Sequence, residues 1–104
     1  MSGVLDALLL VLALLLGGER GEASWYARGL KRPDALTAAS RTWPRGKRLL
    51  VIHPGNRRAV VVRVNDYGPE AWTGRVLDLS RGAAQLLGIV KKGYGEVIIL
   101  PLGS

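Results

Sequence analysis

Two apolar segments near the middle of the chain are separated by turn residues. Residues 47–53 (KRLLVIH) and 59–65 (AVVVRVN) are rich in Val, Ile and Leu, and Pro54, Gly55 and Asn56 lie between them. Branched apolar runs on both sides of such a tripeptide are typical of two strands joined by a tight turn. The pattern therefore predicts an antiparallel strand pair.

The rest of the chain adds further short strands and one helix. Residues 75–79 alternate polar and apolar, residues 96–100 form an apolar run, and residues 23–27 and 35–39 are weaker strand candidates. Residues 81–87 are predicted to be helical, with Ser80 as the N-cap and Gly88 just past the end. Five or six strands joined by Gly and Pro turns, with one short helix, indicate an all-β fold, a small closed barrel.

An apolar leader precedes these elements. Residues 4–16 are apolar except for Asp6. Ten to thirteen helical residues reach about 15–20 Å, which is short of the roughly 30 Å hydrocarbon core of a bilayer. The length fits a secretory signal, and Gly21 and Ala23 would allow cleavage after Ala23. We expect residues 1–23 to be the leader of an exported periplasmic, envelope or extracellular protein, and residues 24–104 its domain; a retained interfacial anchor and a buried helix are the alternatives.

Composition excludes several kinds of site. The 104 residues allow one domain, contain no Cys and hold one His, His53. Disulfide scaffolds, thiol nucleophiles and His or Cys metal clusters are therefore excluded, and we expect no metal and no cofactor. The formal net charge is +7, and residues 24–104 carry fourteen of the fifteen basic residues and five of the eight acidic ones. This charge predicts attraction to anionic wall polymers, whereas no motif indicates specific nucleic-acid binding.

Four motifs carry a family resemblance. They are ASWY at residues 23–26, LTAA at 36–39, VRVNDYGP at 62–69 and GRVLDLS at 74–80. In this order they resemble the RlpA (rare lipoprotein A) family, exported bacterial proteins with a six-stranded double-psi β-barrel that expansins and barwin share. The resemblance extends from Ala23 to about Leu100 and implies that fold.

The resemblance also implies action on peptidoglycan glycan strands. Members of the family are similar to endolytic transglycosylases, which cut between N-acetylmuramic acid and N-acetylglucosamine. The muramic C6 hydroxyl replaces water as nucleophile there, giving a 1,6-anhydro product, so one carboxyl group can act first as acid and then as base. We expect Asp66, which follows a predicted strand, to be that group, partly buried at a barrel rim beside a groove. Alternatively, it hydrogen-bonds the backbone of its own turn.

This chain departs from the family pattern just before LTAA. Relatives carry a T-A-S-G-E-x-F-D segment there and a His after the motif. Residues 28–35 are shorter and lack the Glu, the family Asp would fall near Arg32, and Ser40 occupies the His position. Asp34 could substitute from a neighbouring position or belong to a plain turn. Two alternatives to a transglycosylase therefore stay open: a non-catalytic glycan-binding or wall-loosening module, similar to expansins, and a basic polyanion-binding protein.

Several other side chains are candidate ligand contacts. Aromatic rings near strand ends stack on sugars or close the ends of a barrel. We expect substrate contacts from Tyr67, Trp72, Ser40, Trp25 and Glu70. Asp78 precedes the predicted helix, where a carboxylate stabilises the positive helix end, and is expected to be structural. We expect a monomer that meets a membrane only through an uncleaved leader.

Overall fold

The strand pair predicted around residues 54–56 is present in the computed structural model, which describes residues 2–103. Strands β4 (Arg48–His53) and β5 (Arg58–Asp66) are antiparallel, in register from Arg48 opposite Arg63 to His53 opposite Arg58. In the turn, the Asn56 side-chain oxygen accepts a hydrogen bond from the Arg58 backbone N–H at 2.8 Å. The prediction of a hairpin is confirmed.

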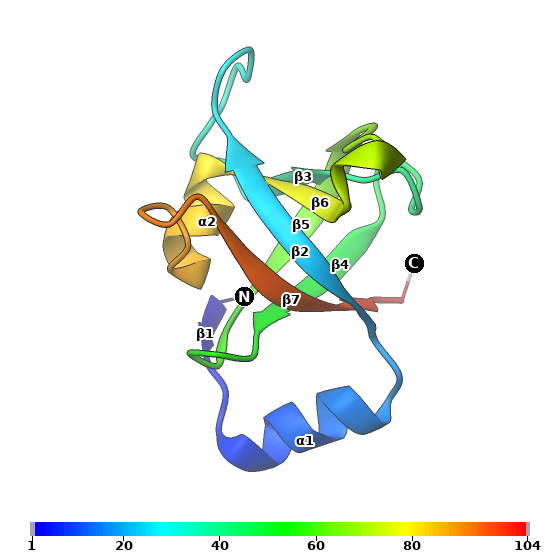
Figure 1. Ribbon diagram of the computed structural model, residues 1–104, viewed down its shortest axis with the longest axis vertical. Helices are drawn as coiled ribbons and strands as arrows, with labels where there is room; N and C mark the ends of the chain where they lie inside the picture. The colour runs from blue at the N-terminus through cyan, green and yellow to red at the C-terminus, as the bar shows by residue number, and fades with distance from the viewer. Residues whose placement is uncertain (1, 104) are drawn as a thin grey trace.

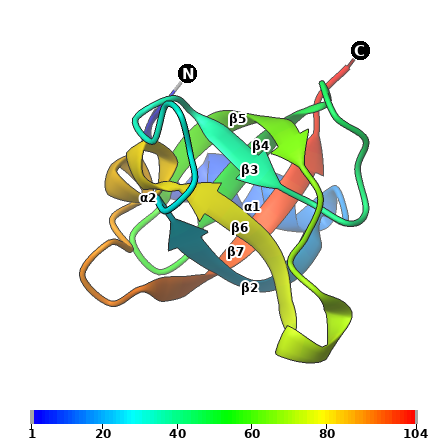
Figure 2. The ribbon, with the colours of Figure 1, turned by 90° about the horizontal axis from the view of Figure 1, so that it is seen from above.

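Four more strands close this pair into a barrel. They are β2 (Glu19–Tyr26), β3 (Thr37–Ala39), β6 (Arg75–Ser80) and β7 (Tyr94–Pro101). The order around the barrel is β5-β3-β6-β2-β7-β4, and the β4–β5 pairing closes it (Figures 1 and 2). The β2–β6 and β3–β5 pairs are parallel and the others antiparallel. The predicted all-β, six-stranded barrel is therefore confirmed.

Alternating strand residues fill the barrel, because successive side chains point to opposite faces of a sheet. Leu49, Val62, Leu77, Leu79 and Ile99 are among the fully buried side chains of this core. Helix α2 (Arg81–Leu87) packs against the core through Ala83, Ala84 and Leu87. Its predicted caps are both present, since the Ser80 Oγ accepts from the Ala83 N–H and Gly88 adopts a left-handed conformation with φ of 82°.

The N-terminal part holds a strand and a helix outside the barrel. Strand β1 (Ser2–Val4) pairs with β5, and helix α1 (Ala7–Leu15) follows. Within residues 2–103, no helix has the length and apolar character needed to cross a membrane. The only other helical turn of the described chain is η1 (Ala71–Thr73), between β5 and β6.

Strand β2 starts four residues before the position predicted from the sequence. Residues from Glu19 to Ser24 pair with β7, and Ala23 is fully buried. Because residues 19, 20 and 22 are charged, the sequence pattern did not predict a strand at these positions. Arg20 forms an ion pair with Glu96 on the neighbouring strand, and Glu22 is the register partner of Glu96, so these two charges lie on the outer face of the strand. The predicted cleavage position after Ala23 thus falls inside β2, and cleavage itself stays a prediction.

Candidate functional site

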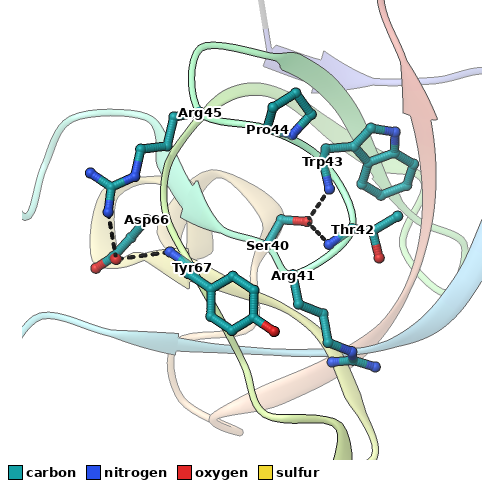
Figure 3. A pocket seen from close by; sticks show the side chains of 8 residues that line it. All are labelled: Ser40, Arg41, Thr42, Trp43, Pro44, Arg45, Asp66 and Tyr67. Atoms are coloured by element: carbon teal, nitrogen blue, oxygen red, sulfur yellow. Dashed lines mark hydrogen bonds and ion pairs between the residues drawn. The ribbon is translucent and has the colours of Figure 1, made fainter.

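A hollow of about 300 Å³ lies beside the end of β5 (Figure 3). One wall is the loop that leaves β3 and the other is the end of β5. The lining residues are Ser40, Arg41, Thr42, Trp43, Pro44, Arg45, Asp66 and Tyr67. Asp66 therefore lies at a rim beside a groove, as we expected from its position at the end of a predicted strand.

The Asp66 carboxylate is accessible from solvent. Its side chain is 53% exposed, so the partial burial that we expected is absent. The Oδ1 atom accepts a hydrogen bond from the Tyr67 backbone N–H at 2.8 Å and lies 3.7 Å from the Arg45 guanidinium (Figure 3). The alternative prediction for Asp66 was a hydrogen bond to the backbone of its own turn, and the contact with the Tyr67 N–H is such a bond. It engages one carboxylate oxygen, and the group remains reachable by a ligand.

Ser40 holds the loop that forms the other wall. It is 3% exposed, and its Oγ accepts hydrogen bonds from the Thr42 and Trp43 backbone N–H groups, both at 3.0 Å (Figure 3). Its own N–H donates to the Asp66 carbonyl at 3.0 Å. The residue that replaces the family His therefore shapes the wall through backbone contacts, and its side-chain oxygen is already engaged.

Arg41 joins this loop to the next one. Its guanidinium donates to the carbonyl oxygens of Pro69 and Arg75, at 2.8 and 2.7 Å. Pro69 belongs to the connection between β5 and β6, and Arg75 is the first residue of β6. Because a guanidinium has several donors in a rigid plane, one side chain fixes both segments beside the hollow.

The strand register brings a second carboxylate near Asp66. Ala39 pairs with Asp66 on β5 and with Asp78 on β6, so both acids lie in one row with the small Ala39 between them. Two strand spacings separate their Cα atoms by roughly 10 Å. Asp78 in turn accepts a hydrogen bond from the Ser24 Oγ at 2.5 Å. This contact with a neighbouring strand fits the expected structural role of Asp78, and the effect of its charge on the helix end stays a prediction.

Tyr26 lies close to both carboxylates. It is two residues beyond Ser24 on β2 and therefore on the same face of the sheet. Burial raises the pKa of the Tyr26 hydroxyl above its ordinary value, and the charges of Asp66 and Asp78 raise it further. The hydroxyl stays protonated near neutral pH and can donate a hydrogen bond. The proximity of Tyr26, Asp66 and Asp78 was not predicted, because these residues are far apart in the sequence and only strand pairing brings them together.

Two of the predicted aromatic contacts are exposed on the β5–β6 connection. Tyr67 is 64% and Trp72 is 84% exposed. Glu70, exposed on the same connection, precedes η1, and its carbonyl accepts from the Thr73 N–H and hydroxyl. Rings this exposed can stack on the apolar face of a sugar.

Trp25 is placed differently from these rings. It is partly buried against the barrel core, and its indole N–H donates to the Val90 carbonyl at 3.1 Å. Its register partner is the buried Leu79, so Trp25 faces the barrel interior. We therefore assign Trp25 to the packing of the barrel end, the alternative role for these aromatics, and not to ligand contact.

The remaining titratable candidates lie apart from the hollow or are paired. Asp34 Oδ1 is 2.9 Å from the Arg81 guanidinium in an exposed ion pair. His53 Nδ1 accepts from the Gly55 N–H in the β4–β5 turn, and burial, with Lys92 nearby, lowers the pKa of its imidazole. No group of three His, Asp or Glu side chains suited to a metal ion occurs in the part of the chain that the structure describes.

Sequence comparison links the barrel to one family. Residues 18–99 match the family model described as lytic transglycolase. The probable endolytic peptidoglycan transglycosylase RlpA of a Nostoc species is 44% identical over 96 residues, covering 81% of this chain and 26% of the relative. The endolytic peptidoglycan transglycosylase RlpA of Campylobacter jejuni is 38% identical over 93 residues, covering 80% of this chain and 34% of the relative. The chain thus spans about a quarter to a third of the length of these relatives.

Solved structures show the same fold at low identity. An expansin of Clavibacter michiganensis superposes with a TM-score of 0.64 at 22% identity, over 82% of this chain and 50% of the expansin. A variant of a Clavibacter michiganensis expansin in complex with cellohexaose superposes with a TM-score of 0.63, also at 22% identity, over 81% of this chain and 50% of that one. The barrel is therefore shared with proteins of distant sequence.

Proposed function

Because the chain belongs to the lytic transglycolase family of RlpA-like double-psi β-barrels, we propose that it cleaves the glycan strands of peptidoglycan. The products would end in 1,6-anhydromuramic acid, as in an endolytic transglycosylase. The observation that carries the proposal is the open Asp66 carboxyl group at the rim of a hollow. Export to the cell envelope, where this substrate lies, is part of the same proposal.

Asp66 acts twice in the proposed reaction. Its protonated carboxyl group donates a proton to the glycosidic oxygen while the bond from that oxygen to the muramic C1 breaks. The resulting carboxylate then takes the proton of the C6 hydroxyl as O6 bonds to C1. Water is not consumed, and the carboxyl group ends protonated, as it began. The solvent-open position of Asp66 supports this cycle, since the same group must reach both oxygens.

The groups around Asp66 suit a sugar ligand. Asp78 and the Tyr26 hydroxyl lie in the same part of the sheet and supply an acceptor and a donor for sugar hydroxyls. The exposed rings of Tyr67 and Trp72 extend the surface along the β5–β6 connection. A similar barrel in an expansin is known in complex with cellohexaose, which supports glycan binding by this fold.

A second candidate is a glycan-binding module without catalysis. It is favoured by Ser40, whose buried hydroxyl bonds its own loop and cannot titrate near neutral pH. In this reading the hollow and the exposed rings hold the strand, and the bond stays intact.

One incubation separates the two candidates. The full chain is incubated with purified, peptide-stripped glycan strands, and the products are examined by mass spectrometry. Strands ending in anhydromuramic acid support the transglycosylase. Co-sedimentation with sacculi without such products supports the binding module. Binding that ignores uncharged glycan and vanishes at high salt would contradict both and favour a general polyanion binder.

Trp72→Ala is expected to weaken binding to glycan strands about tenfold. A ring that is 84% exposed contributes little to the core, so its loss removes stacking area and leaves the barrel intact. Sedimentation with sacculi measures the change. Tyr94→Ala is the matched control, because Tyr94 is an exposed ring at the start of β7 and belongs neither to the hollow nor to the β5–β6 connection that carries Trp72. Equal losses in the two variants would remove Trp72 from the binding surface.

A further inference from the structure

Helix α1 covers an apolar patch on the outer wall of the barrel. Ile52 and Ile98 are fully buried on the outer faces of β4 and β7, where Ala59 joins them. Leu10 and Ala13 of α1 pack on this patch. Outer positions of a closed barrel are ordinarily polar, so the patch requires a cover. The helix is thus docked on a surface that suits it.

The opposite side of α1 is apolar and exposed. Leu8, Leu12 and Leu15 follow one another at intervals of four and three residues, and are 69%, 48% and 77% exposed. Leu9, Val11 and Leu16 are exposed beside them. A helix that is apolar all round is stable only where both of its sides are removed from water. The barrel covers one side, and the other lacks a cover within the described chain.

Two arginines, Arg57 and Arg58, lie next to the start of this helix, whose N-cap is the carboxylate of Asp6. The Leu5 N–H donates to the Arg57 carbonyl at 2.7 Å, and Val4 pairs with Arg58 on β5. Both arginines are exposed. Apolar side chains beside exposed arginines complement a bilayer whose headgroups are anionic. With nine residues, α1 is about 14 Å long and suits the surface of the bilayer, not its full thickness.

The strand register indicates that signal cleavage does not remove α1 from the chain. Within residues 1–23, Gly21 and Ala23 are the one pair of small residues at the spacing that signal cleavage requires. Both lie inside β2, and a cut after Ala23 would remove the residues that pair with β7 between Glu19 and Ala23. It would also uncover Ile52 and Ile98. Cleavage there would therefore remove part of β2 and also expose the apolar patch on the outer wall of the barrel.

We propose that α1 is retained and binds the surface of an anionic membrane through Leu8, Leu12 and Leu15. Figure 1 shows α1 at one end of the molecule and β3, whose Ala39 pairs with Asp66, toward the other. A barrel held in this way turns the Asp66 hollow away from the bilayer. The inference goes beyond the proposed function and does not depend on glycan cleavage.

Membrane flotation and mass measurement test the proposal on the full chain. The protein is produced in a bacterial host, and the mass of the membrane-bound species is measured. We expect the mass of a chain that still contains α1. The purified chain is then floated with vesicles of phosphatidylglycerol and, separately, of phosphatidylcholine, and we expect stronger binding to the first.

A matched pair of variants isolates the helix. Leu12→Ser with Leu15→Ser is expected to lower vesicle binding roughly a hundredfold, because two apolar side chains no longer enter the bilayer. Leu86→Ser with Tyr94→Ser also changes two exposed apolar side chains, but outside α1, and should bind like the unmodified chain. Circular dichroism confirms that both variants are folded.

Three outcomes would overturn the proposal. The first is a mature chain that begins after residue 15, since α1 would then be lost. The second is equal vesicle binding by the two double variants. The third is an intact chain that self-associates through the helix and does not float, which would assign the apolar side to a second copy. None of these outcomes bears on anhydromuramic products, so the proposed function is tested separately.

Discussion

Asp66→Asn is expected to reduce the formation of anhydromuramic ends about a thousandfold or more. An amide has no acidic proton to transfer to the glycosidic oxygen and is too weak a base to take one from the C6 hydroxyl, so both steps are lost. The structure should survive, because the Asn side-chain oxygen can still accept from the Tyr67 N–H. Product release from peptide-stripped strands, followed by mass spectrometry, measures the loss.

The control for this variant is Asp34→Asn. Asp34 is also an exposed aspartate in an ion pair with an arginine, but it belongs to the loop before β3 and does not line the hollow. The Asp34→Asn variant should cleave glycan strands at the rate of the unmodified chain, and both variants should sediment with sacculi. An Asp66→Asn variant that still cleaves would exclude Asp66 as the acid and leave only its role in the turn.

Leu79→Ala is expected to lower the free energy of unfolding by about 3 kcal/mol. Leu79 is fully buried on β6, paired with Ala38 on one side and Trp25 on the other. Truncation leaves a cavity, because strands paired on both sides cannot move together to fill it. Urea unfolding of the full chain, followed by tryptophan fluorescence, gives the difference.

Leu86→Ala makes the same chemical change at an exposed position. Leu86 on α2 is 41% exposed, so its truncation should cost less than about 1 kcal/mol. If both variants unfolded at the same urea concentration, Leu79 would not belong to a close-packed core, and the barrel interior described above would be wrong.

Local sequence predicted most of the elements because their signals are short-range. The Val, Ile and Leu runs of β4 and β5 and the turn residues between them can be read without knowing any distant partner. The same holds for Ser80 and Gly88 at the ends of α2. The start of β2 was not predicted, since the register partners of Glu19 and Arg20 are Ile99 and Ile98, far along the chain on β7.

The residues of the candidate site also differ in whether local sequence is enough to predict them. Asp66 was predicted from the family resemblance together with a local pattern, a carboxylate after a predicted strand and before Gly68 and Pro69. Trp25 was predicted to contact ligand because it is an aromatic residue near a strand end. Neither property indicates which face of the sheet the side chain lies on. Register decides that side, and here it turns the ring toward Leu79.

By itself, the sequence determined the kind of fold and the turns, and it predicted Asp66 as the acid, through residue types whose effects extend over a few neighbours. Only the tertiary structure decided that Asp78 and Tyr26 lie near Asp66, and that an apolar outer wall holds α1. The physical reason is that strand pairing and parallel crossings join residues far apart in the chain. A shift of one residue in any strand would send the same side chains to the opposite face.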